Sequence, residues 1–405
     1  MKWNKALSLT LAGAMAAGML AGCSVSTSGG DAAEPGSSSS GGAKTVKIGV
    51  FEPSTGDSGA GGKQEMLGMQ YANVETPTVE IGGETYNVEL VYSDNGSTTD
   101  KAVSAASKLV DEGVSLVLGS YGSGVSIAAA PTFEEAGIPA IGVTCTNPNV
   151  TAGNPYYFRI CFLDPFQGTV LANFAAEKFS ATKAYCLGEL GNEYDQGLIE
   201  YFTQAFEAKG GSVVADSFPT NNSDFSTYLN KAKDEGAQVI FCPVSIAYAT
   251  QIVKQAASMG LELPLLGSDT LDSNKVLEAG TGSNVQLYVS TFYQEGGSPE
   301  FDEGIKSWLN SDATAKTNNG GNDTIAAVTA MGYDAYYVAL EALKAAGSTD
   351  AKAVYEALPG VTYTGVTGAI AFDDVNGDAV RDTAYIKVAD NANTAWNLET
   401  EQKAE

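Results

Sequence analysis

Four short stretches of this sequence place hydroxyl, amide and carboxylate side chains directly after runs of apolar residues that are typical of β-strands. These stretches are residues 119–124, 144–148, 191–197 and 267–270. In an open parallel sheet, ligands bind beyond the carboxyl ends of the strands, so binding chemistry is expected here. None of the four stretches contains a lysine or an arginine.

Two of these residues have complementary chemistry. Ser123 lies where a helix would begin, and the free N–H groups and the dipole of a helix N-terminus favour a carboxylate there. Asp269 supplies a negative charge for an ammonium group. Together such groups could hold a small zwitterion without any basic side chain. The simpler interpretation is that both residues only cap helices.

No histidine occurs among the 405 residues, and this excludes several classes of enzyme. A Ser-His-Asp hydrolase, a Cys-His protease and a zinc site built on imidazole each require that side chain. Neither a GxSxG nucleophile elbow nor a GxxxxGK(S/T) phosphate loop is present. A secreted enzyme that works through carboxylates alone is the one enzymatic alternative left.

The composition is strongly acidic, with 22 Lys and Arg residues against 48 Asp and Glu residues and a formal net charge of −26. Nucleic acids are held mainly by basic side chains, and no local basic patch offsets this acidity. We therefore expect no nucleic-acid partner. Hydrophobic residues make up 44% of the chain, which is enough to bury a core, and the length predicts about two to three compact units.

The N-terminus has the pattern of an exported lipoprotein. Residues 1–22 combine two lysines with a long apolar run, as in a secretory signal peptide. The run ends in Leu-Ala-Gly-Cys at residues 20–23, which resembles the lipobox of bacterial lipoproteins, in which the cysteine, here Cys23, is acylated. Residues 23–43 are rich in serine and glycine and are expected to form a flexible tether. The alternative is an ordinary signal peptide with a chance cysteine.

From Lys44 onward, short β-branched runs alternate with segments whose apolar residues recur every three or four positions. This alternation predicts an α/β fold with parallel sheets covered by helices on both faces. It forms two successive sets, one before and one after about residue 163, each the size of a doubly wound domain. The predicted strands are 46–51, 88–92, 116–118, 140–143, 184–187, 213–217, 239–242, 263–266 and 287–290.

The C-terminal part of the sequence follows a different pattern. It predicts helices over 300–309, 324–346 and 351–358, and then a β-hairpin made of 368–372 and 383–388. The Asp-rich turn between the two hairpin strands lacks the closing glutamate of a calcium loop, and Asp and Asn in a tight turn need no ion. We expect no metal there.

Four cysteines besides Cys23 occur without CxxC spacing, namely Cys145, Cys161, Cys186 and Cys242. A metal cage is therefore not expected. The apolar neighbours of these cysteines fit buried free thiols, and one or two disulfides are the alternative in an exported protein.

A set of motifs, none of them decisive alone, occurs in a specific order between about Lys44 and Val388. Besides the lipobox and tether, they are Glu134-Glu135-Ala136-Gly137-Ile138-Pro139, Tyr157-Phe158-Arg159 with Asp164 and Gln167-Gly168, Tyr194-Asp195-Gln196-Gly197, Lys254-Gln255-Ala256 before Gly260, and Gly332-Tyr333-Asp334-Ala335. Together they resemble the leucine/isoleucine/valine-binding class of ABC-importer substrate-binding lipoproteins. The resemblance covers essentially the whole mature body.

This resemblance implies the type I periplasmic-binding-protein fold. In that fold, two Rossmann-like doubly wound lobes with parallel central sheets are joined by a three-stranded hinge and close on a small ligand. The implied organisation is a signal peptide over 1–22, a lipidated Ser/Gly-rich tether over 23–43, lobe 1 over 44–163 plus 292–364, lobe 2 over 164–291 plus 365–398, and a tail over 399–405.

The same resemblance assigns substrate-binding residues. Ser123 corresponds to the hydroxyl that grips the α-carboxylate. Thr146 corresponds to the threonine that contacts both carboxylate and ammonium, with the backbone of Thr144 beside it. Tyr194 matches the tyrosine of the second lobe that closes over the ligand, and Asp269 matches the acid that pairs with the α-ammonium. Taken singly, Thr146 could also be turn filler and Tyr194 a surface aromatic.

The chain departs from the family in the pocket for the ligand side chain. Where the family often has an aromatic residue in the first loop, residues 59–62 read Gly-Ala-Gly-Gly. Where a tyrosine commonly follows the strand ending at Cys242, residues 244–246 read Val-Ser-Ile. Tyr121 is expected to refill part of this pocket, and the two losses leave the ligand side chain open.

The resemblance implies an extracytoplasmic receptor that is anchored to the bacterial cell membrane through lipid on Cys23. It would capture a branched-chain or other aliphatic amino acid by hinge closure and deliver it to an ABC permease. No cofactor, metal or catalytic residue is implied, and such receptors are commonly monomers. The alternatives are a sensor that reports its ligand to a chemoreceptor or kinase, and the same transport role for an amide, urea or aromatic compound.

Overall fold

A computed structural model describes residues 44–404 of the chain. The predicted signal peptide, the predicted tether and Cys23 lie outside the described residues. Among residues 44–404, no helix has the length and apolar character needed to cross a membrane.

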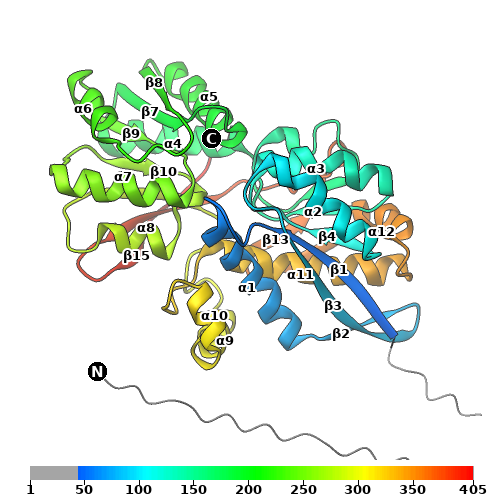
Figure 1. The fold of residues 1–405 in the computed structure, drawn as a ribbon. Helices are drawn as coiled ribbons and strands as arrows, with labels where there is room; N and C mark the ends of the chain where they lie inside the picture. The colour runs from blue at the N-terminus through cyan, green and yellow to red at the C-terminus, as the bar shows by residue number, and fades with distance from the viewer. Residues whose placement is uncertain (1–43, 405) are drawn as a thin grey trace, which may run out of the picture. The chain divides into compact units, whose positions relative to one another are not determined.

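The first sheet has six strands in the order β2-β3-β1-β4-β5-β6, and Figure 1 labels the first four of them. All of its neighbouring strands run parallel except β2, which pairs antiparallel with β3. The strands are β1 (Lys44–Glu52), β2 (Thr78–Ile81), β3 (Glu84–Asp94), β4 (Leu116–Leu118), β5 (Ala140–Gly142) and β6 (Tyr157–Arg159).

Helices cover both faces of this sheet because the buried side chains of β1 point alternately to either face. Val50 belongs to an apolar layer shared with α1 and α11, whereas Phe51 packs edge to face on Phe133 of α3 with 5.6 Å between the ring centres. The helices of this part are α1 (Gly59–Glu75), α2 (Thr99–Asp111), α3 (Ser123–Ala136), α9 (Pro299–Ser311), α10 (Ala313–Asn318), α11 (Ala327–Ala346) and α12 (Ala351–Ala357).

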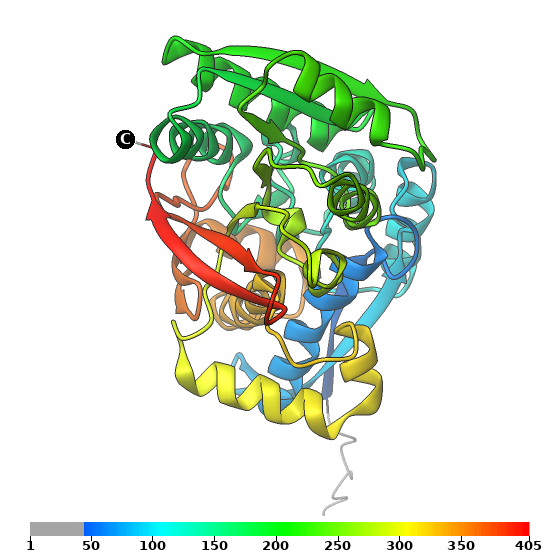
Figure 2. The same cartoon turned by 90° about the vertical axis from the view of Figure 1, so that its left-hand side faces the viewer.

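The second sheet has seven strands in the order β15-β14-β11-β10-β9-β7-β8. Its five strands from β7 to β11 are parallel, and β14 and β15 add antiparallel to one edge, as the red strands in Figure 2 show. The strands are β7 (Lys183–Glu189), β8 (Ser212–Phe218), β9 (Val239–Phe241), β10 (Leu265–Gly267), β11 (Leu287–Thr291), β14 (Ala384–Asp390) and β15 (Ala395–Gln402).

The second sheet is also covered on both faces. Cys186 of β7 lies in the layer that contains Phe202 of α5, and the next residue, Leu187, lies in the layer that contains Ile252 of α7. The helices are α4 (Asp164–Phe179), α5 (Glu193–Ala208), α6 (Ser226–Asp234), α7 (Ile246–Met259) and α8 (Asn274–Gly280). The predicted fold class, two doubly wound α/β units with mostly parallel sheets, is confirmed.

The chain passes between the two sheets three times. It leaves the first sheet after β6, returns after β11 to form α9 to α12, and joins the second sheet again at β14. These passages place the loops at the carboxyl ends of both sets of parallel strands against each other.

The predicted C-terminal hairpin of 368–372 with 383–388 is wrong. The strand β13 (Gly368–Ala371) pairs with β12 (Thr362–Gly365), whereas β14 pairs with β11 and β15. Pairing at the sheet edge buries Ala384 and Ile386, which a free hairpin would leave exposed. The strand β15 also continues to Gln402, so three residues of the predicted tail, 400–402, are paired with β14.

Two further details of the sequence are explained by the fold. The carboxylate of Asp373 accepts hydrogen bonds from the backbone N–H groups of residues 375, 376 and 377, so this turn is closed by its own backbone. The four cysteines within residues 44–404 are free and buried, which decides between the two interpretations that the sequence left open.

Candidate ligand-binding site

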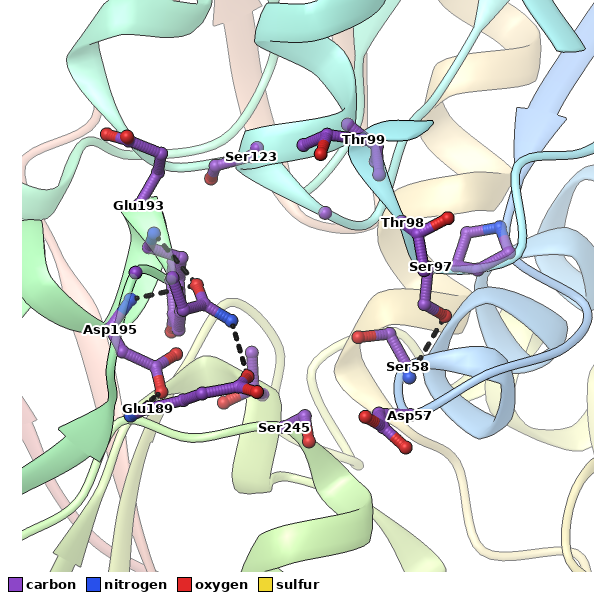
Figure 3. A pocket seen from close by; sticks show the side chains of 18 of the residues that line it. Asp57, Ser58, Ser97, Thr98, Thr99, Ser123, Glu189, Glu193, Asp195 and Ser245 are labelled. Carbon is purple, nitrogen blue, oxygen red and sulfur yellow. Dashed lines mark hydrogen bonds between the residues drawn. The ribbon is translucent and has the colours of Figure 1, made fainter. Parts of the chain in front are cut away.

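A cavity of about 290 Å³ lies between the loops that follow strands of the two sheets. Figure 3 shows Asp57, Ser97 and Ser123 from the first set of loops opposite Glu189 and Ser245 from the second. Among the described residues that line the cavity, none is a lysine or an arginine. The cavity therefore lies beyond the carboxyl ends of the strands, where the sequence predicts binding chemistry.

Ser123 is the first residue of α3 and lines the cavity together with Gly122 and Gly124. The N-cap position is occupied by Gly122, and no side chain caps the helix. The first N–H groups of α3 are therefore free to bind an anion. The Ser123 hydroxyl accepts a hydrogen bond from the backbone N–H of Asn147 at 3.2 Å, which ties α3 to the loop after β5. The interpretation of Ser123 as a helix cap is wrong.

Tyr121 also lines the cavity, and its position is fixed at both ends. Its backbone N–H donates to Oε2 of Glu52 at 2.8 Å, and its hydroxyl donates to the backbone carbonyl of Thr270 at 3.4 Å. A Cβ atom on Gly61 would lie 2.4 Å from Cζ of the Tyr121 ring. The tyrosine ring therefore occupies the space that a side chain at position 61 would fill.

The loop after β5 carries Thr144 and Thr146, and Arg159 holds its shape. The buried guanidinium donates to the backbone carbonyls of Cys145 and Asn147 at 2.9 and 2.6 Å, and it pairs with Asp378 at 2.7 Å. The Thr144 hydroxyl donates to the carboxylate of Glu65. The Thr146 hydroxyl is buried and has no hydrogen-bond partner.

Asp269 lies at the start of the short helix η2 (Asp269–Leu271), directly after β10. Its Oδ1 accepts hydrogen bonds from the Tyr194 hydroxyl at 2.6 Å and from Nε2 of Gln167 at 2.7 Å. Its Oδ2 is buried without a partner. Burial raises the pKa of Asp269 to about 6, although the bonds from Tyr194 and Gln167 oppose the rise.

Asp164 and Gln167 open α4 on the side of Asp269 and Thr146. Asp164 has no exposed surface, both of its carboxylate oxygens lack hydrogen-bond partners, and its backbone N–H donates to the carbonyl of Thr146 at 3.0 Å. Burial raises the pKa of Asp164 to about 7, the nearby Thr146 hydroxyl opposes the rise, and the charge of Asp269 adds to it. We refer to Thr146, Asp164, Gln167 and Asp269 as the inner cluster.

A second pair of buried acids lies beside the inner cluster. Glu65 of α1 accepts the bond from Thr144, and Glu52 ends β1. Burial raises the pKa of both carboxyl groups, and the charge of Glu65 raises the pKa of Glu52 further. One oxygen of each carboxylate has no partner.

The inner cluster has more hydrogen-bond acceptors than donors. Unpartnered acceptor oxygens occur on Asp164, Gln167 and Asp269. Two buried cations of the protein already have acidic partners. Arg159 pairs with Asp378, and Lys387 pairs with Asp272 at 3.0 Å. Buried polar groups without partners are costly, so a ligand that brings positively charged donors would be stabilised here. No group of three or more His, Cys, Asp or Glu residues within 44–404 has the arrangement of a metal site.

The structure places the predicted site residues in two layers. Tyr121, Ser123 and Tyr194 line the cavity, whereas Thr146 and Asp269 are buried next to it, and Tyr194 links the two layers through Asp269. The side chain of Thr144 is directed to Glu65.

Sequence reasoning missed Asp164, Gln167, Glu52 and Glu65 as site residues. The sequence offered an indication of Asp164 and Gln167, because an acid and an amide three residues apart lie in the first turn of the helix that follows the first passage between the sheets. The indication for the two glutamates in the sequence was weaker. Glu52 ends a strand, and Glu65 is a charged residue on a helix face that is otherwise buried.

Comparisons with known proteins agree with this architecture. The profile of the periplasmic binding protein family matches residues 45–393. The Leu/Ile/Val-binding protein homolog 3 of Brucella melitensis is 30% identical over 338 residues, which cover 79% of this chain and 86% of that protein.

Solved structures show the same likeness. The leucine-binding protein LivK of Thermotoga maritima has a TM-score of 0.78 at 31% identity, over 89% of this chain and 99% of that one. The LivJ protein of Streptococcus pneumoniae, solved with isoleucine, has a TM-score of 0.76 at 27% identity, over 89% and 99%.

The fold and the cavity between two α/β units define a two-lobed solute-binding protein. The chain belongs to the periplasmic binding protein family, whose members are non-enzymatic solute-binding proteins.

Proposed function

We propose that this protein captures an α-amino acid between its two lobes and delivers it to an ABC importer. The observation that carries the proposal is the inner cluster, in which buried oxygens of Asp164 and Asp269 have no donor. An α-ammonium group supplies three donors and a positive charge. The uncapped N-terminus of α3 lies at the same cavity and suits the α-carboxylate.

Each predicted residue has a role in this proposal. Ser123 and the N–H groups of α3 bind the carboxylate, and Thr146 with the backbone of Thr144 lies between the carboxylate and the ammonium. Asp269, oriented by Tyr194 and Gln167, pairs with the ammonium. Tyr121 contacts the aliphatic part of the ligand. The relatives that are named for binding leucine, isoleucine and valine support an aliphatic side chain.

Closure of the lobes is favoured by bonds that join loops of the two sheets. Nδ2 of Asn147 donates to the backbone carbonyl of Glu193 at 3.0 Å, and the Tyr121 hydroxyl donates to that of Thr270. A ligand that contacts both sets of loops adds to these bonds only in the closed state, and this difference shifts the population toward closure.

The proposed location is the outer face of the cell membrane, with lipid on Cys23 as the anchor and the Ser/Gly-rich tether as the spacer. The motif at residues 20–23 and the family of extracytoplasmic receptors support it. The partner is the permease of the importer, and the receptor is proposed to be a monomer.

Replacing Cys23 with alanine should abolish acylation, and acylated, membrane-attached C23A protein would contradict the anchor.

The test of the proposal is calorimetric titration of residues 44–405 with each of the twenty amino acids. We expect at least one α-amino acid to bind with micromolar or tighter affinity, and its α-amide and its deaminated analogue to bind far more weakly. Binding of benzoate, urea or a simple amide in the absence of binding by any amino acid would contradict the proposal.

A further inference from the structure

The outer part of the cavity is lined by acids from both lobes. Asp57 lies in the loop between β1 and α1, and Glu189 lies at the end of β7. Figure 3 shows Asp57 and Glu189 on opposite sides of the cavity, with Ser245 between them. Closure therefore brings like charges together across a gap that no Lys or Arg among the described lining residues neutralises.

The charge of Glu189 acts on Asp57 across the cavity. Partial burial and the charge of Glu189 raise the pKa of Asp57, and the hydroxyl of Tyr248 opposes the rise. That same hydroxyl donates to Oε1 of Glu189 at 3.2 Å. Tyr248 is thus close to both acids. The other Glu189 oxygen accepts a long bond of 3.3 Å from Nδ2 of Asn192.

Ser245 provides an independent indication that a ligand group belongs here. Its side chain lines the cavity, the residue is only 8% exposed, and its hydroxyl oxygen has no hydrogen-bond partner. Although Ser245 precedes α7, it makes no capping bond to that helix. A buried hydroxyl without a partner is costly, and a ligand group in the cavity would satisfy it.

We propose that the ligand is a basic α-amino acid, whose second positively charged group is bound by Asp57, Glu189 and Ser245. This inference rests on the proposed function, because it takes the α-carboxylate and α-ammonium to be held at the inner end of the site. One cavity extends from Ser123 and Tyr194 to Asp57 and Glu189. The ring of Tyr121 lines the same cavity and offers an apolar surface to the methylene stem.

Charge balance favours this ligand over a neutral one. A zwitterion with an aliphatic side chain brings no net charge to the outer part of the cavity, and Asp57 and Glu189 then face each other unpaired. A side-chain ammonium or guanidinium placed between them pairs with both carboxylates. The proposed ligand thus combines an unbranched aliphatic stem with a terminal cation.

The test compares two ligands that differ in the terminal charge, lysine and norleucine, by calorimetric titration of residues 44–405. We expect lysine to bind at least tenfold more tightly than norleucine, with ornithine and arginine included to find the best stem length. The D57N/E189Q double variant should reduce the lysine-to-norleucine affinity ratio to about one. The E207Q variant changes an exposed acid of α5 far from the cavity and should leave the ratio unchanged.

Thermal unfolding of each variant establishes that it is folded. If norleucine or leucine binds as tightly as every basic amino acid, or if the double variant keeps the ratio of the wild type, the inference is overturned while the proposed function stands. If no amino acid binds, the proposed function itself fails. If the lysine-to-norleucine affinity ratio falls in the D57N/E189Q variant and also falls with rising salt, this supports a direct ion pair between the ligand side chain and these acids.

Discussion

The inner cluster contains the acids Asp164 and Asp269, and the outer part of the cavity contains Asp57 and Glu189, which we call the outer acids. The two pairs differ in their surroundings. Asp164 and Asp269 are buried, whereas Asp57 is exposed and Glu189 is half-buried. Two unit charges 4 Å apart interact by roughly 1 kcal/mol in water and about 4 kcal/mol at the effective dielectric of a protein surface. The inner acids should therefore decide whether a ligand binds, and the outer acids which ligand is preferred.

The substitution with the largest expected effect is Asp269→Ala. It removes the carboxylate that Tyr194 and Gln167 orient, so the ammonium loses its charged partner in a buried site. We expect amino-acid binding to fall by at least about 100-fold, equivalent to about 3 kcal/mol. Calorimetry measures the loss, and Asp111→Ala, at an exposed acid on α2, is the control. Unchanged affinity would remove Asp269 from the site.

Asp164→Asn should separate two effects of this buried acid, its cost to the stability of the fold and its contribution to ligand affinity. In the ligand-free protein, an unpartnered carboxylate is replaced by a neutral amide, so unfolding should require about 1 to 3 kcal/mol more free energy at pH 8. Ligand affinity should fall by about tenfold or more, because the ammonium loses an acceptor charge. Thermal unfolding with and without ligand measures both quantities. A variant that is less stable and binds normally would assign Asp164 a structural role.

The pH dependence of binding follows from the same acids. Burial raises the pKa of Asp269 to about 6 and that of Asp164 to about 7, above the unfolded value of roughly 3.9. In the proposed complex the ammonium pairs with the ionised acids, so binding should release protons below pH 7, and affinity should weaken on the order of tenfold or more from pH 8 to pH 5. Titrations in buffers of different ionisation enthalpy would detect the released protons. Constant affinity would indicate that neither acid meets the ligand.

The stability of the ligand-free protein should change in the opposite direction. Because the folded-state pKa values lie above the unfolded values, the folded state binds extra protons between these limits. As far as these groups are concerned, stability is therefore greatest below about pH 4, declines as the pH rises from there to about 6 to 7, and is level above that range. Melting temperatures measured across this range, with Asp164→Asn as the flatter reference, test the sign.

The smallest expected effect is that of Tyr121→Phe, which tests a bond between the lobes rather than a contact to the ligand charges. The substitution removes the 3.4 Å hydrogen bond to Thr270 and keeps the ring beside Gly61. Since a bond of this length is weak, affinity should change by less than about threefold. A change as large as that of Asp269→Ala would mean that the hydroxyl itself binds the ligand.

Much of the architecture followed from local patterns. The runs at 46–51 and 116–118 became strands because each is apolar and β-branched, and their burial on both faces marks parallel strands. The C-terminal hairpin could not be assigned this way, because the edge of a seven-stranded sheet offers β14 more partners than its neighbour in sequence does. The short strand β2 was missed, since four residues with two exposed give little signal.

The candidate site was only partly predictable for the same reason. Ser123 and Asp269 were visible because each follows a strand, and the ends of parallel strands meet at one edge. The lack of hydrogen-bond partners for the side chains of Asp164 and Ser245 could not be predicted, because the sequence near these residues does not show which groups from other elements will pack against them.

The sequence by itself determined the kind of chemistry open to this protein. Without a histidine and with no basic residue after these strands, it could hold a zwitterion through hydroxyls, helix N-termini and acids. Only the tertiary structure decided which acids lie at the proposed site. Folding brings Asp164 and Asp269 together in a buried place where a charge without a partner is costly, and it sets Asp57 opposite Glu189 across the cavity.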